Sequence, residues 1–143
     1  MERRTLLMGA GLVVAGAAAQ TALAAQDHSQ HQHGGGTYPA LAAAAANCVK
    51  AGQVCLDHCF ALLGQGDKTL APCAQSATQM TAVCATLQLL AAQSSPYLAK
   101  YAKVAMEVCQ GCEAECRKHE SKHQACKACA ESCAACAKAC QSA

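Results

Sequence analysis

Thirteen cysteines are the residues of this chain whose type and spacing could do chemistry. Five of them fall within CKACAESCAACAKAC, residues 126–140, at alternating intervals of three and four. Side chains with this spacing share one face of an α-helix, so the five thiols form a single stripe. The same spacing marks the core positions of helices in a bundle, where leucine or isoleucine normally lies. The stretch therefore predicts a helix that buries thiols, which can bind soft metal ions or form disulfides.

The rest of the chain supplies three more helices that would position these thiols. We expect helices over about residues 40–63, 69–93, 96–119 and 121–141, because alanine is abundant and Ser121 can cap the last segment. The links between these segments are short, which favours antiparallel neighbours. The sequence therefore predicts an all-α fold, an antiparallel up-down-up-down four-helix bundle with a cysteine-lined core.

All thirteen cysteines follow the inner faces of these helices and number three, two, three and five along the chain. Thiols thus occupy the positions at which an ordinary bundle buries large aliphatic side chains. We therefore treat every cysteine as a candidate metal ligand: Cys48, Cys55, Cys59, Cys73, Cys84, Cys109, Cys112, Cys116, Cys126, Cys129, Cys133, Cys136 and Cys140.

The antiparallel arrangement also predicts that the two ends of the bundle differ. One end gathers His58, His119 and His123 beside cysteines, which indicates a mouth lined with imidazole groups that could bind an entering metal ion. A simpler interpretation is that these histidines are solvated residues at helix ends, where they complement the helix dipole. The other end gathers apolar side chains: Leu41, Leu87, Leu90, Tyr97, Leu98 and Tyr101.

Two methionines within the predicted helices are candidate accessory ligands. Met80 lies between two cysteines of the second helix, and Met106 lies three residues before Cys109. A thioether is a soft donor that suits Cu(I). Methionine also fills irregular gaps in hydrophobic cores, and core filling is the simpler interpretation of both residues.

A disulfide scaffold is one interpretation of so many cysteines in an exported chain. However, thirteen is an odd number, and cysteines three or four residues apart lie mostly on one helix. A disulfide between such neighbours closes almost no loop and stabilises little. A disulfide-stabilised structural or interaction protein remains an alternative, but the spacing favours metal binding.

The choice of metal depends on charge. CxxC pairs such as Cys109 and Cys112 are typical of zinc, but a tetrathiolate zinc site carries about −2, and no lysine or arginine points into the predicted core to compensate it. Cu(I) is soft, prefers thiolates and accepts few ligands. One Cu(I) per thiolate is electrically neutral, so a column of such sites can be buried. We expect many Cu(I) ions, about one per cysteine, with a general zinc or cadmium sink as an alternative.

Catalysis and nucleic-acid binding are both disfavoured by the sequence. No grouping of acid, base and nucleophile is recognisable, so we expect a binding protein and not an enzyme. The formal net charge is only +2, without a basic run, so we expect no nucleic-acid partner.

The first 24 residues are typical of a cleaved export signal, with a charged start, a short apolar stretch and small residues before the cleavage site. Arg3 and Arg4, followed by Thr5 and two leucines, resemble a twin-arginine signal, which predicts export of the folded protein to the periplasm. The apolar stretch is too short and too rich in glycine for stable membrane insertion. We expect a flexible tail rich in histidine and glycine over residues 25–37, and the bundle domain over residues 38–143.

The cysteine-rich segments CVKAGQVCLDHC, CQGCEAEC and CKACAESCAACAKAC, behind such a leader, resemble the copper storage protein family. More narrowly, they are similar to its exported branch from methane-oxidising bacteria, over about residues 38–143. The resemblance implies that thiolate-bound Cu(I) fills the bundle and that copper enters at one open end. It also implies a homotetramer that supplies copper to copper enzymes, such as the membrane-bound methane monooxygenase. The expected protein partner is therefore a copper-accepting enzyme or chaperone.

Overall fold

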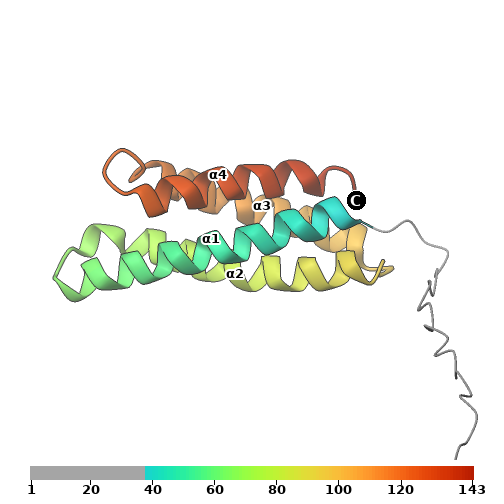
Figure 1. The fold of residues 1–143 in the computed structure, drawn as a ribbon, viewed down its shortest axis with the longest axis horizontal. Coiled ribbons are helices and arrows are strands. Elements are labelled where there is room, and N and C mark those ends of the chain that lie inside the picture. The colour runs from blue at the N-terminus through green and yellow to red at the C-terminus, as the bar shows by residue number, and fades with distance from the viewer. Residues whose placement is uncertain (1–37) are drawn as a thin grey trace, which may run out of the picture. The chain divides into compact units, whose positions relative to one another are not determined.

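The computed structural model describes residues 38–143, and the predicted leader and tail lie outside the described residues. The described chain forms four α-helices in a bundle (Figure 1). A short 3-10 helix, η1 (Lys68–Leu70), precedes the second of them. The four helices are α1 (Pro39–Gly64), α2 (Ala71–Ala92), α3 (Leu98–Arg117) and α4 (Gln124–Cys140).

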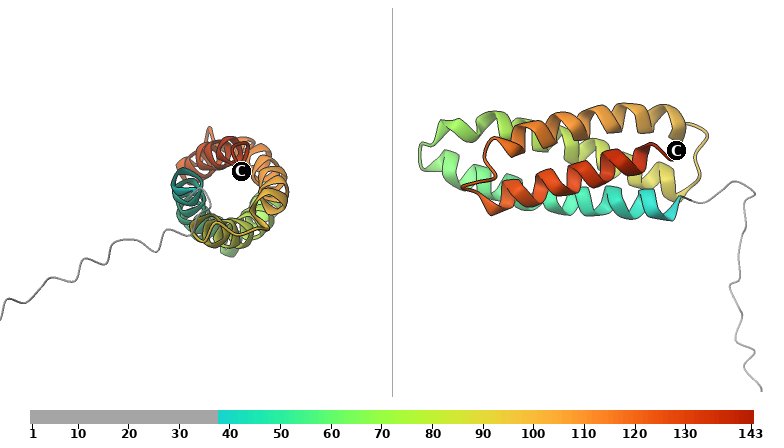
Figure 2. Two further views of the ribbon diagram at one scale, coloured as in Figure 1. Left: turned by 90° about the vertical axis from the view of Figure 1, so that its right-hand side faces the viewer. Right: turned by 90° about the horizontal axis from the view of Figure 1, so that it is seen from above.

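The helices run up and down around a common axis, as Figure 2 shows from the end and from the side. Each helix packs against the helices before and after it in the sequence, and α1 also packs against α4. The turns after α1 and α3 therefore share one end of the bundle, while the turn after α2 and the end of the chain share the other (Figure 1). This arrangement confirms the predicted four-helix bundle.

Local sequence signals explain where most helices begin and end. Pro39 and Pro72 lie in the first turns of α1 and α2, where proline loses no intrahelical hydrogen bond. Gly66 follows the end of α1 with a φ angle of +93°, which favours glycine because it has no Cβ. The carboxylate of Asp67 then accepts a hydrogen bond from the backbone N–H of Thr69, at 3.0 Å, and starts η1.

The start of α4 differs from the prediction. The helix begins at Gln124, with His123 in the N-cap position, and Ser121 is exposed in the preceding turn without capping the helix. The reason is that the backbone N–H groups of this turn are bonded back to the end of α3, for example His119 to the carbonyl of Cys116 at 3.0 Å. These bonds satisfy the last carbonyls of α3, and the chain turns into α4 only after them.

The core consists mainly of cysteine and alanine. All thirteen cysteines are buried, and the most exposed of them, Cys140, is only 6% exposed. No charged or polar residue within residues 38–143 is buried. The thiols therefore lie in an uncharged interior, as the heptad-like spacing predicted. Within the same residues, no helix combines the length and hydropathy that a membrane span requires.

The apolar end of the bundle matches the prediction except at one position. Five of the predicted residues are buried or pack against the core: Leu41, Leu87, Leu90, Leu98 and Tyr101. Tyr97 does not, because it occupies the N-cap position of α3 and its side chain is 70% exposed. We call this end, where α2 meets α3, the apolar end.

Candidate metal centre

The thirteen cysteines are free thiols that the helices direct toward one another. The sulfur–sulfur separations of neighbouring cysteines from different helices begin at 3.5 Å, well beyond the roughly 2.05 Å of a disulfide bond. Twelve of the thirteen fall into four groups, three of which share members, and within each group the sulfur atoms lie within 4.8 Å of one another. The arrangement is therefore that of a set of metal ligands and not of a disulfide scaffold.

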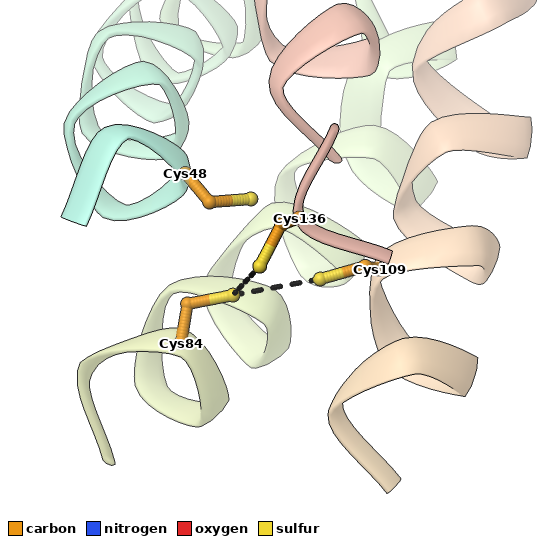
Figure 3. Close-up of side chains that lie close together, drawn as sticks. All are labelled: Cys48, Cys84, Cys109 and Cys136. Carbon is orange, nitrogen blue, oxygen red and sulfur yellow. Dashed lines mark hydrogen bonds between the residues drawn. The ribbon is translucent and has the colours of Figure 1, made fainter. Parts of the chain in front are cut away.

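One group of four thiols draws one ligand from each helix. Cys48, Cys84, Cys109 and Cys136 come from α1, α2, α3 and α4, and their side chains point inward toward one another (Figure 3). The Sγ atom of Cys84 lies 3.5 Å from that of Cys109 and 3.9 Å from that of Cys136. We call these residues the four-helix group.

A second group of four lies toward the other end of the bundle. Cys55 and Cys59 come from α1, Cys73 from the first turn of α2 and Cys126 from the first turn of α4. The Sγ atom of Cys73 lies 3.8 Å from that of Cys55 and 3.9 Å from that of Cys126. We call these residues the entrance group, because they lie beside the predicted histidine mouth.

Two groups of three connect these sets. The first consists of Cys55, Cys116 and Cys129. The second consists of Cys112, Cys129 and Cys133, so the two groups have Cys129 in common. The Sγ atom of Cys133 lies 3.7 Å from that of Cys48, a member of the four-helix group. Sulfur atoms therefore follow one another through the core, from the entrance group to the four-helix group, without a charged residue among them.

Cys140 is the one predicted ligand that lies outside these four groups. It ends α4, one helical turn after Cys136, and the two side chains interact. It lies toward the apolar end, where the four-helix group is its neighbour through Cys136. The 3-4 spacing placed it correctly on the inner face, but spacing does not indicate how many partners a residue meets there.

The uncharged interior shifts the ionisation of most thiols. Burial is the largest cause that raises the pKa of Cys59 and of Cys126, because a buried thiolate loses its hydration. Interaction with neighbouring thiols adds to this effect elsewhere. The pKa is raised at nine positions: Cys59, Cys73, Cys84, Cys109, Cys116, Cys126, Cys129, Cys133 and Cys140.

Four thiols show the opposite shift. Hydrogen bonding with Cys116 lowers the pKa of Cys55 and Cys112, and hydrogen bonding with Cys109 lowers that of Cys136. The pKa of Cys48 is lowered as well, again chiefly through Cys109. A thiolate at these positions is stabilised by neighbouring S–H donors.

The histidines predicted for the mouth do lie together. The Nε2 atom of His58 lies 3.0 Å from the Nδ1 atom of His123, and the ring of His119 is centred 6.5 Å from that of His123. The buried Nε2 atom of His119 has no hydrogen-bond partner among the described residues, although Glu115 Oε1 lies 3.9 Å away. The three rings therefore offer nitrogen donors where α1 lies beside the turn between α3 and α4, while the four sulfur groups themselves contain only cysteine.

The two methionines differ in their surroundings. Met80 is fully buried, and its Sδ atom lies 3.2 Å from the Sγ atom of Cys48. Met106 is half-buried and packs against the core. The structure therefore brings one of the two candidate accessory ligands to the thiols.

Two residues near the entrance were not singled out from the sequence. Leu70, in η1, is fully buried three residues before Cys73. Glu115 approaches His119 from one helical turn earlier. The sequence did contain a signal for both: Leu70 lies three residues before Cys73, and Glu115 lies four residues before His119. Residues at these spacings share a helical face.

Comparison with known proteins gives one family and several similar structures, which include two copper storage protein chains. The profile of the family described as "Csp: Copper storage protein" matches residues 35–143. Apo-Csp3 (copper storage protein 3) from Bacillus subtilis is 28% identical with a TM-score of 0.64, over 73% of this chain and 95% of that one. The Cu(I)-bound copper storage protein BsCsp3 is 27% identical with a TM-score of 0.65, over 74% and 97% of the two chains. No curated protein matches the sequence.

Proposed function

The chain belongs to the copper storage protein family, and we propose that it stores many Cu(I) ions, about one per cysteine, on the thiolates inside its bundle. Family membership makes it a binding protein and not an enzyme. The observation that carries the proposal is the continuous set of thirteen buried thiols in a core without buried charge. The Cu(I)-bound form of BsCsp3, a protein of similar fold, supports the choice of metal.

The geometry suits Cu(I) better than zinc. Each Cu(I) that replaces one thiol proton leaves the charge of the core unchanged, whereas a zinc ion on four thiolates leaves about −2. No buried charged residue within residues 38–143 is available to compensate that charge. Groups of three thiols also fit Cu(I), which accepts low coordination numbers, better than a tetrahedral ion.

The decisive experiment is a copper titration of the reduced full chain. Anaerobic addition of Cu(I), in the presence of a competing chelator, should saturate at about one ion per cysteine, thirteen in the chain. Saturation at one or two ions would overturn the proposal. Parallel titrations with zinc and cadmium test the general metal sink, which requires that these ions be retained in preference to copper.

A count of free thiols addresses the disulfide alternative. Anaerobically purified apo-protein should react with about thirteen equivalents of a thiol reagent after unfolding without reductant. Zero or one reactive thiol would instead support a disulfide-stabilised structural protein.

We also propose that copper enters at the histidine end. Three imidazole rings lie together beside the entrance group, and the unpartnered Nε2 atom of His119 is available to a cation. An ion held there by neutral nitrogen ligands could pass to the thiols of Cys59, Cys73 and Cys126. The buried side chain of Leu70 lies at the same end of α2, one turn before Cys73, and would line the route.

We further propose that the protein is exported, forms a homotetramer and supplies copper to copper enzymes, such as the membrane-bound methane monooxygenase. Arg3 and Arg4 support the twin-arginine route to the periplasm. Exposed apolar side chains, among them Phe60 at 58% and Leu89 at 54%, support an interface between chains. The supply of copper to enzymes rests on the family resemblance.

These proposals have separate tests. Replacing both arginines, in Arg3→Lys/Arg4→Lys, keeps the charge but should block export. Light scattering of the purified protein should give about four times the mass of one chain, which is 14.6 kDa before the predicted leader is removed, and a monomer would contradict the tetramer. Copper-loaded protein should restore activity to a copper-depleted enzyme, and no restoration would contradict the supply role.

A further inference from the structure

The inner face of α2 contains a sulfur atom that is not a thiol. This helix has only two cysteines, Cys73 and Cys84, whereas α4 has five. Between them the same face continues through Ala77 and Met80, and all four side chains are fully buried. Met80 therefore occupies the position in α2 at which the set of thiols would otherwise be interrupted.

The thioether of Met80 lies against a thiol and not merely among aliphatic groups. Its Sδ atom is 3.2 Å from the Sγ atom of Cys48, closer than the cysteine sulfur atoms of the four groups lie to one another at their nearest, 3.5 Å. Cys48 in turn lies 3.7 Å from Cys133, which connects the four-helix group to the groups of three. Sulfur atoms from α1, α2 and α4 thus meet at this junction.

Gly52 explains how Met80 reaches this position. A Cβ atom on Gly52 would lie 2.6 Å from the Cε atom of Met80 and 2.6 Å from the Oγ1 atom of Thr81. The Thr81 hydroxyl donates a hydrogen bond to the carbonyl of Ala77 at 2.7 Å, so it has little freedom to move aside. Glycine is unfavourable inside a helix, and here it makes room for the terminal methyl group of Met80.

We infer that Met80 is a fourteenth sulfur ligand, whose thioether binds Cu(I) together with the thiolates of Cys48 and Cys133. This inference rests on the proposed storage of Cu(I) by the cysteines. The thioether is soft, as Cu(I) requires, and it adds a donor to the uncharged core without adding negative charge. The site joins the four-helix group to the rest of the thiols, so an ion bound there lies between the two ends of the set.

Methyl NMR tests this inference directly on the wild-type full chain. The protein is labelled with ¹³C at the methionine methyl groups and titrated anaerobically with Cu(I), which is diamagnetic. The variants Met80→Leu and Met106→Leu assign the resonances. We expect the Met80 methyl signal to shift as copper is added, and the signal of half-buried Met106 to shift much less. A Met80 signal that stays in place while the cysteines fill with copper would overturn the inference.

The titration separates this inference from the proposed function, because the copper content is measured on the same samples. Saturation at one or two ions would overturn copper storage itself, whatever the methyl signals do. As a second readout, Met80→Leu should release about one equivalent of copper to a competing chelator at a concentration that removes none from Met106→Leu. Equal retention by the two variants would count against a thioether ligand at Met80.

Discussion

The two ends of the bundle are built from the same four helices but differ in chemistry. At the apolar end, Leu41, Leu87 and Leu98 are buried and close the core with aliphatic side chains. At the histidine end, the entrance group of thiols lies beside His58 and His123. Both ends satisfy the same helical spacing, so the spacing determines the fold while the residue types decide which end can receive a metal ion.

This difference suggests that the apolar end mainly stabilises the fold and that the thiol-rich core mainly binds metal. Buried leucine side chains stabilise a fold through the apolar area that they remove from water. Thiols are smaller and bury less area, so the thiol-rich part of the core should depend on bound metal for much of its stability. Changes to the bound metal or to either end of the bundle test whether stability and binding are separate in this way.

The largest effect should come from loading the protein with copper. Each independent site that binds only the folded state adds about 2.7 kcal/mol at a ligand concentration of one hundred times Kd. With many sites, we expect the melting temperature to rise by tens of degrees. Calorimetry of apo and loaded protein measures the change. Equal melting temperatures would contradict a core of ligands that is already folded in the apo state.

Removing a leucine from the apolar end should destabilise the protein but leave storage intact. Leu87→Ala leaves a cavity in the core and should lower the free energy of unfolding of the apo protein by about 2–5 kcal/mol. Leu89→Ala, on the same helix but 54% exposed, is the matched control and should change it little. Urea denaturation gives the stability and copper titration gives the capacity. A large loss of copper in folded Leu87→Ala would mean that the two ends are not separable.

Alkaline pH should destabilise the apo protein through its thiols. Nine thiols have a raised pKa in the fold, so they stay neutral at a pH where the unfolded chain, with its ordinary value of 9.0, already ionises. The stability that these thiols contribute is therefore present below about pH 9 and is lost as the pH rises above it. A thiol that is about ten times less acidic in the fold than in the unfolded chain contributes about 1.4 kcal/mol of this loss.

Denaturation of apo protein between about pH 9 and pH 10.5 checks this sign. The four thiols with a lowered pKa act in a different pH range: they are ionised in the fold while the unfolded chain is still protonated, so their contribution rises with pH up to about pH 9 and is constant above it. Loaded protein, whose thiolates are already bound to copper, should be much less sensitive over the same range. Apo stability that rises with pH above about pH 9 would contradict the raised pKa of the nine thiols.

The smallest effect on stability should come from the histidine end. His58→Ala removes one ring of the pair with His123 and should slow the initial rate of copper uptake about tenfold without changing capacity. Asp57→Ala, at the neighbouring exposed position of α1, is the control. Stopped-flow measurement of copper transfer from a chelator gives the rates. An unchanged rate would place the entrance elsewhere on the bundle.

The sequence predicted the fold and the burial of every cysteine because both follow from intervals of three and four along a helix. It did not predict the grouping of the thiols, which depends on how far neighbouring helices are shifted and rotated relative to one another. It also misplaced the start of α4. The preceding turn is hydrogen-bonded to the end of α3, so α4 begins only at Gln124. The close approach of Met80 to Gly52 is a contact between α1 and α2, so it could not be predicted from the sequence around either residue.

The absence of buried charge among the described residues has a consequence for recognition. Under the proposed function, each Cu(I) ion replaces one thiol proton, so the net charge and the isoelectric point of the protein stay almost constant from empty to full. The outer surface of the bundle then carries the same electrostatic field in both states. A partner that delivers or withdraws copper must therefore distinguish a full protein from an empty one at the histidine end, or by its rigidity, and not by long-range attraction.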